Sequence, residues 1–176
     1  MAASFGGLVL TKSGINLLAQ AQAGKELKIL RIDIGDGQLE TSESMISLTQ
    51  LKNKLFSCEI INKQIIQDKI LKISFMLTSQ EQEFTWREVG VIAEDPTTHE
   101  EVLYCYGNAG KNGEYIAPTG SADVLERKVN LDLLVSNISH ISVVINESII
   151  FVSKKEYDIK MAEIEKNIGK KSDKKK

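Results

Sequence analysis

The strongest strand signal in the chain is Phe84-Thr85-Trp86-Arg87-Glu88-Val89-Gly90-Val91-Ile92-Ala93-Glu94. Aromatic and β-branched residues run through it, and the turn-forming Asp95-Pro96-Thr97-Thr98 closes it. Its apolar side chains fall on both faces, which is typical of a central strand that is covered on both sides. Arg87 and Glu88 interrupt this pattern. Charged side chains in a buried strand need partners or a position at the edge of the core.

Trp86, the single tryptophan, and its neighbour Arg87 have two interpretations. The simpler one is a core strand with a charged rim. The other is a contact made during assembly, because tryptophan and arginine are enriched where proteins meet. We keep Trp86 and Arg87 as a candidate docking contact beside the core interpretation.

Outward from this stretch, short strands alternate with turns. Gly35-Asp36-Gly37 ends one strand, and the glycines supply the conformational freedom of a tight turn. The stretch 41–51 is polar and fits a short helical turn, and the glycine-punctuated stretch 107–120 reads as a loop. The pairs 55–67 with 70–77, and 84–94 with 101–106, read as hairpins. The expected strands are 27–34, 55–67, 70–77, 84–94, 101–106, 124–135 and 141–145.

Helical spacing appears at both ends of the chain. Thr11 or Ser13 can cap a first helix, and Gly24 stops it. At the other end, Ser153 with Glu156 has the spacing of a capping box. A heptad seam follows at steps of four, three and four residues, and isoleucine at seam positions favours trimers or tetramers. The alternative is one amphipathic helix packed on the body. The seam residues are Tyr157, Met161, Ile164 and Ile168.

These patterns predict an α+β protein. Its strands are mostly antiparallel, with an N-terminal helix and a C-terminal helix that starts a trimeric coiled coil. We expect a body at 1–150, the helix at 151–169 and a basic, disordered tail at 170–176.

Composition limits the classes of partner. The chain has 176 residues, 42% of them hydrophobic, which suffices for a core. Of the net charge of −2, the lysine-rich last seven residues contribute +4, so the first 169 residues carry −6. An acidic body argues against nucleic-acid binding. The chain shows neither a signal-peptide pattern nor an apolar run long enough to span a membrane. We expect a soluble protein made in the cytoplasm, without membrane insertion.

The search for chemistry gives a negative expectation. His99 and His140 lack partners at metal-ligand spacing, and the sequence contains neither a phosphate-binding loop nor a nucleophile elbow. Cys58 and Cys105 lie in apolar, strand-like runs, where buried free thiols are the first interpretation and a disulfide between them is the second. We expect no catalytic residue, no cofactor and no metal, and therefore a protein that is not an enzyme.

The order of the motifs is similar to a known family. Gly35-Asp36-Gly37 is followed by Arg87-Glu88-Val89-Gly90, by a strand that ends in Gly107-Asn108, and by a strand that ends in Val135-Ser136-Asn137. Ile149-Ile150-Phe151-Val152-Ser153 then enters the expected helix. In this order they resemble the N-terminal domain of bacteriophage tail-collar fibre proteins, over roughly residues 5–160.

The resemblance implies a structural component of a contractile phage tail or of a phage-tail-like bacteriocin. The body would attach a fibre to the baseplate, as a homotrimer whose C-terminal helices begin the shaft. Its partners would be baseplate proteins and a more distal fibre protein. Because little sequence follows Ser153, a short adaptor for another fibre protein is expected rather than a long receptor-binding fibre. The rivals are a monomeric assembly chaperone or binding module and, less well supported, a small cell-wall hydrolase.

Overall fold

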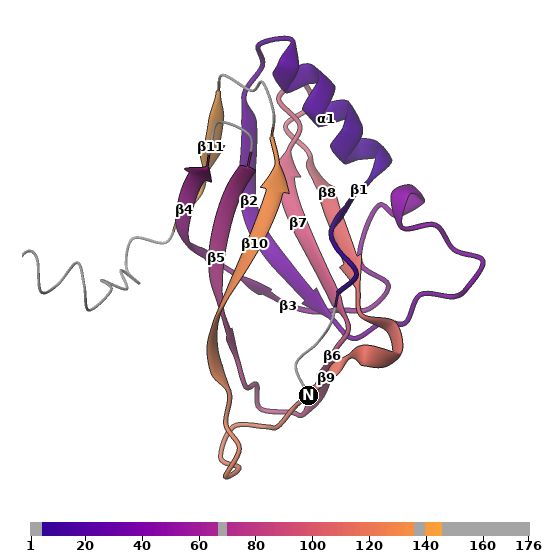
Figure 1. Ribbon diagram of the computed structural model, residues 1–176, viewed down its shortest axis with the longest axis vertical. Coiled ribbons are helices and arrows are strands. Elements are labelled where there is room, and N and C mark those ends of the chain that lie inside the picture. The colour runs from indigo at the N-terminus through magenta and orange to yellow at the C-terminus, as the bar shows by residue number, and fades with distance from the viewer. Residues whose placement is uncertain (1–4, 67–69, 136–139, 146–176) are drawn as a thin grey trace, which may run out of the picture. The chain divides into compact units, whose positions relative to one another are not determined.

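Strands form about half of the computed structural model, which describes residues 5–66, 70–135 and 140–145 (Figure 1). These residues belong to one compact unit, 1–146. The elements in chain order, with η marking 3-10 helices, are β1 (Val9–Leu10), α1 (Lys12–Gln22), β2 (Leu27–Gly35), η1 (Met45–Ser47), β3 (Lys54–Cys58), β4 (Ile60–Ile66), β5 (Ile70–Thr78), β6 (Phe84–Trp86), β7 (Glu88–Glu94), β8 (Glu101–Asn108), η2 (Gly110–Asn112), β9 (Glu114–Ile116), β10 (Glu126–Leu134) and β11 (Ile141–Val143).

The strands form three sheets. The largest has the order β1-β8-β7-β2-β11, and β3 adds to β2 beside that path. All its pairs are antiparallel except β11 with β2, which is parallel. A second sheet has the order β10-β5-β4, and a third consists of β6 and β9. As expected from its sequence, β7 is central in its sheet and buried along nearly its whole length.

The main core lies between the two larger sheets, which stack face to face in Figure 1. Strict alternation along β5 sends every second side chain into this core, and those of Leu71, Ile73, Phe75 and Leu77 are completely buried. The large sheet contributes Ile29, Ile32, Ile34 and Val91 from the other side. The half-buried pattern predicted for residues 70–77 is therefore confirmed in β5.

The helix α1 packs against β8, with its first turn over that strand (Figure 1). Thr11 is the N-cap, and its Oγ1 accepts a hydrogen bond of 3.0 Å from the backbone N–H of Gly14. The chain leaves the helix through Gly24, whose φ of +97° is one that side chains rarely adopt. The predicted N-terminal helix is confirmed. None of the helices in the described residues is long and apolar enough to cross a membrane.

The predicted α+β class is wrong, because the described residues form mostly antiparallel sheets with a single α-helix. One short helix lies on a sheet and does not form a helical layer. The predicted C-terminal helix at 151–169 and the tail at 170–176 lie outside the described residues.

Several strand boundaries also differ from expectation. The predicted strand 84–94 is two strands, β6 and β7, and they belong to different sheets. The predicted strand 55–67 divides between Cys58 and Ile60 into β3 and β4. The short strands β1 and β9 were not predicted, because two or three residues carry no periodic signal.

Candidate functional site

The side chain of Glu88 is completely buried at the start of β7, and its carboxylate accepts four hydrogen bonds. Its Oε1 accepts from the backbone N–H of Lys52 at 2.7 Å and from the hydroxyl of Tyr106 at 2.6 Å. Its Oε2 accepts from the backbone N–H groups of Gly37 and Asn53, both at 2.9 Å. Donors in all four positions match an ionised carboxylate, which has only acceptors. Glu88 therefore fastens both ends of the segment 36–53, called the 36–53 loop below.

The neighbouring motifs reinforce this connection. The guanidinium of Arg87 donates through Nη1 to the backbone oxygen of Asp36 at 3.1 Å. Asn108, at the end of β8, donates through Nδ2 to the backbone oxygen of Gly37 at 3.0 Å and to the hydroxyl of Tyr106 at 2.8 Å. Burial raises the pKa of Tyr106, and its hydrogen bond to Glu88 raises it further. The phenol therefore stays protonated at neutral pH.

A second, small core lies beneath the 36–53 loop. Gly90 makes it possible, since a Cβ at that position would lie 2.4 Å from a methyl group of Leu51 and 2.8 Å from one of Leu103. The glycine thus provides the space into which Leu51 inserts. The buried members are Leu51, Ile92, Leu103 and Tyr106, with Leu30, Leu39, Met45 and Leu48 packed around them.

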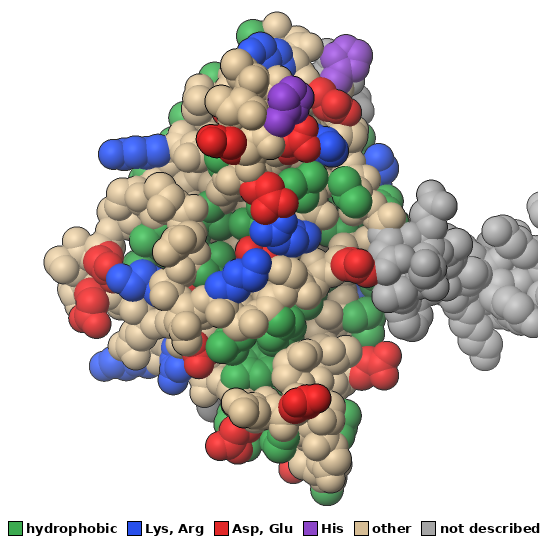
Figure 2. Space-filling model, turned by 180° about the vertical axis from the view of Figure 1, so that it is seen from behind, with side chains coloured by type: hydrophobic (Ala, Val, Ile, Leu, Met, Phe, Trp, Pro, Cys, Tyr) green, Lys and Arg blue, Asp and Glu red, His purple; other side chains and the backbone are tan. Residues whose placement is uncertain are grey.

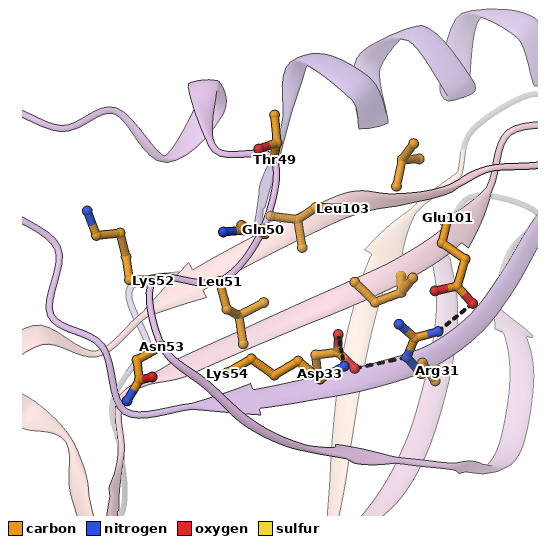
Figure 3. A pocket seen from close by; sticks show the side chains of 12 residues that line it. Arg31, Asp33, Thr49, Gln50, Leu51, Lys52, Asn53, Lys54, Glu101 and Leu103 are labelled. Carbon is orange, nitrogen blue, oxygen red and sulfur yellow. Dashed lines mark hydrogen bonds and ion pairs between the residues drawn. The ribbon is translucent and has the colours of Figure 1, made fainter.

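A groove of about 410 Å³ lies between this loop and the strands β2 and β8 (Figure 3). Asp33, almost fully buried, accepts hydrogen bonds from Arg31 Nε at 3.0 Å and Ser57 Oγ at 2.7 Å, and pairs with Lys54 Nζ at 2.8 Å. Arg31 also donates through Nη1 to Glu101 at 2.6 Å. Leu51 and Leu103 supply apolar walls.

The groove carries charges of both signs, and the described residues around it show no metal-binding cluster. Basic and acidic side chains are interspersed on the face seen in Figure 2, so no single sign of charge dominates it. The lining contains no histidine or cysteine. Among the described residues, no group of three or more His, Cys, Asp or Glu side chains is placed to hold a metal ion. The groove thus combines paired charges, among them Arg31, Asp33 and Glu101, with the apolar side chains of Leu51 and Leu103.

The two predicted docking residues occupy different positions. Trp86 is buried, donates through Nε1 to the backbone oxygen of Glu88 at 3.0 Å, and packs on Phe5 with 4.8 Å between ring centroids. The guanidinium of Arg127 lies 5.7 Å from the centroid of the Trp86 ring. Arg87 reaches Asp36 and so contacts the 36–53 loop. Their docking role stays a prediction, as does the oligomer seam Tyr157, Met161, Ile164 and Ile168, which lies outside the described residues.

Comparison with known protein families identifies the family of this chain. The family model described as phage tail-collar fibre protein, N-terminal, matches residues 1–155. The chain belongs to this family. The resemblance seen in the sequence is thereby confirmed, and the domain is a structural component of phage tails, associated with the virion. No curated protein and no solved structure matches the chain.

The cysteines of this tail-collar fibre domain are free thiols, so the disulfide alternative does not apply. Burial raises the pKa of Cys105 to about 12, and burial together with the charge of Asp33 raises that of Cys58 to about 12. At pH 8 only about one thiol in 10⁴ is then ionised. We expect Ellman's reagent to leave the folded domain almost unlabelled and to release two equivalents after unfolding in guanidinium. Rapid labelling of the folded domain would contradict the burial of these thiols.

Sequence reasoning did not find the role of the 36–53 loop in this domain. It identified Glu88 as a charge needing partners, but the backbone groups that bind its carboxylate lie 35 to 51 residues away. The motifs quoted for the family resemblance do carry the signal. Gly35-Asp36-Gly37, Arg87-Glu88-Val89-Gly90 and Gly107-Asn108 meet at one hydrogen-bonded node.

Proposed function

We propose that this protein anchors a tail fibre to the baseplate of a contractile phage tail or phage-tail-like particle. Membership of the tail-collar fibre family over residues 1–155 carries this proposal. In it the protein has no enzymatic activity, is made in the bacterial cytoplasm and joins the particle during tail assembly. A homotrimer that passes into a fibre shaft, or that receives a further fibre protein, is the form of assembly we propose.

The 36–53 loop and its groove are the proposed baseplate contact. Three backbone N–H groups of the loop donate hydrogen bonds to Glu88, and the loop packs on a small core of its own, so it is held in place. A surface that is ordered before binding loses less entropy when a partner docks. Ile46, on η1 of this loop, exposes 42% of its surface and offers an apolar contact on the same loop.

The test compares particles made with and without the gene, and particles that carry single variants. We expect particles without the gene to lack the fibre in electron micrographs. Ile46→Asp should reduce the amount of this protein in purified particles at least tenfold, since a charge at the centre of an interface is strongly unfavourable.

The matched control is Val124→Asp, which introduces the same charge at an apolar side chain that is 53% exposed and lies outside the loop. It should be incorporated normally, and both variants should unfold at the temperature of the unmodified protein. Complete particles without the gene would overturn the anchor and favour an assembly chaperone. Normal incorporation of Ile46→Asp would instead overturn the loop as the contact and leave the anchor standing.

A further inference from the structure

One edge of the strand β10 has no partner strand within residues 5–66, 70–135 and 140–145. The other edge pairs with β5 over nine residues without a register shift. The backbone N–H of Ser79 donates to the oxygen of Leu125 at 2.9 Å, which continues this register and fixes its phase. Because bonded pairs alternate along an antiparallel ladder, odd-numbered residues of β10 direct their backbone groups to β5 and even-numbered ones direct theirs outward.

Space is available beside this edge. A hollow of about 700 Å³ borders residues 127–132, with Phe5, Leu8 and Trp86 on its other side. Val129 and Leu131 line the hollow and are only partly covered. A long strand with free backbone groups and an open apolar flank can accept another strand.

The side chains of β10 are complementary to those of a second β10 that runs antiparallel to it. With Asn130 opposite Asn130, Lys128 faces the other chain's Asp132, and Asp132 faces the other chain's Lys128. Val129 then faces Leu131 on the apolar side, again twice. Even-numbered residues face even-numbered residues, so the outward N–H and C=O groups of the two strands meet. A two-fold contact requires this kind of self-complementarity.

Neighbouring registers of the same phase lack this match. Centring the pair on Lys128 places two lysines opposite each other, and centring it on Asp132 does the same with two aspartates. A centre at Val129 sets Glu126 against Asp132, and a centre at Leu131 pairs no opposite charges. Like charges directly opposite each other disfavour pairing. Among these registers, the one centred on Asn130 is therefore the only one that brings opposite charges together.

We propose that two copies of this protein join through their β10 strands, antiparallel and centred on Asn130. The contact makes one continuous six-stranded sheet from two three-stranded ones. It uses residues 126–134, whereas the predicted trimer seam uses residues beyond 156, so the two contacts are separate. A two-fold contact of this kind links protein copies that do not share one three-fold axis.

Cysteine cross-linking of the full chain tests the register. In Asn130→Cys the two new cysteines face each other across a bonded pair, where Cα atoms are about 5.5 Å apart, within the range of a disulfide. In the control, Lys128→Cys, the two cysteines lie four residues out of register, about 13 Å apart. We expect diamide to cross-link the first variant to a dimer and leave the control unlinked. The native cysteines are buried and should not contribute.

Charge reversal in the Asn130→Cys background supplies the second measurement. Lys128→Glu sets glutamate against Asp132 twice, and Asp132→Lys sets lysine against Lys128 twice. Each should slow cross-linking about tenfold. Carrying both reversals in one chain should restore the rate, and so should mixing the two single-reversal proteins, which then form a mixed dimer.

The results separate this contact from the alternatives. Equal cross-linking of the two cysteine variants, or charge reversals without effect, would overturn the proposed register. Absence of any Asn130→Cys dimer, with sedimentation showing monomers or seam-dependent trimers only, would overturn the contact. If Asn130→Cys links instead to a different protein in purified particles, the edge accepts a foreign strand and the self-pairing is wrong.

Discussion

Glu88→Gln should lower the free energy of unfolding by about 3 kcal/mol, a large effect for a change that preserves side-chain volume. Each carboxylate oxygen of Glu88 accepts two hydrogen bonds. An amide replaces one acceptor with an NH₂ group, so either orientation sets that group against two donors. The better orientation points the NH₂ group at Tyr106, whose hydroxyl can turn and accept, but the N–H of Lys52 then loses its partner.

For a chain of this length, 3 kcal/mol corresponds to a decrease of about 6–12 °C in the melting temperature. Thermal unfolding followed by circular dichroism measures it. The matched control is Glu94→Gln on the same strand, which removes the same charge where the partners, Lys28 and His99, lie at the surface. Its melting temperature should stay near that of the unmodified protein. Equal melting temperatures for the two variants would show that Glu88 does not fasten the loop.

Hydrogen exchange locates the effect of Glu88→Gln. In the unmodified protein, Glu88 accepts from the amide groups of Gly37, Lys52 and Asn53. In the variant, exchange at these three amides should accelerate more than exchange at the amides of β5. The strand β5 lies in the other large sheet and serves as the internal reference. Uniform acceleration across the domain would indicate global destabilisation and not release of the loop.

The strands were predictable where the signal is local. Alternation along 70–77 and turn residues after Glu94 each lie within a few positions of the strands they define, and the structure contains those strands. The division at Arg87 was not predictable. Its backbone N–H donates to the oxygen of Gly35, and its backbone oxygen accepts from Ala109, both far away in the sequence. Those two bonds end one strand and start the next in another sheet.

The candidate site was predictable only in part. A charged residue at position 88 of a buried strand indicates that it has hydrogen-bonding partners. Those partners are backbone N–H groups, which nearly every residue has, so the sequence does not show which ones bind it. The space beside Gly90 could not be predicted in detail either. A glycine in a strand indicates a bulge or a close approach, but the sequence does not show that the approaching residue is Leu51. The class assignment was wrong for a related reason: helical periodicity shows that a helix is present but not how large a part of the domain it forms, and α1, which packs mainly on β8, adds Leu17 and Ala21 to a core built mostly by the sheets.

Gly14→Ala is the second variant for which we expect a large effect, which is the net result of two opposing contributions. Gly14 lies in the first turn of α1, where alanine is intrinsically better than glycine by about 1 kcal/mol. A Cβ at this position, however, would lie 1.9 Å from the backbone oxygen of Tyr104 on β8. That oxygen also accepts a 3.1 Å hydrogen bond from the N–H of Thr11, so it is fixed in place.

The steric contribution should dominate. Thr11 caps the helix through the N–H of Gly14 and bonds with its hydroxyl to the oxygen of Leu103, so the first turn cannot move off β8 without losing these bonds. Overpacking a rigid site costs more than the gain in propensity, and we expect a net loss of about 2 kcal/mol, or about 4–8 °C in melting temperature. Gly6→Ala is the control, since a Cβ there meets nothing within 4 Å. A more stable Gly14→Ala protein would mean that helix propensity dominates and that α1 can move away from β8 at little cost.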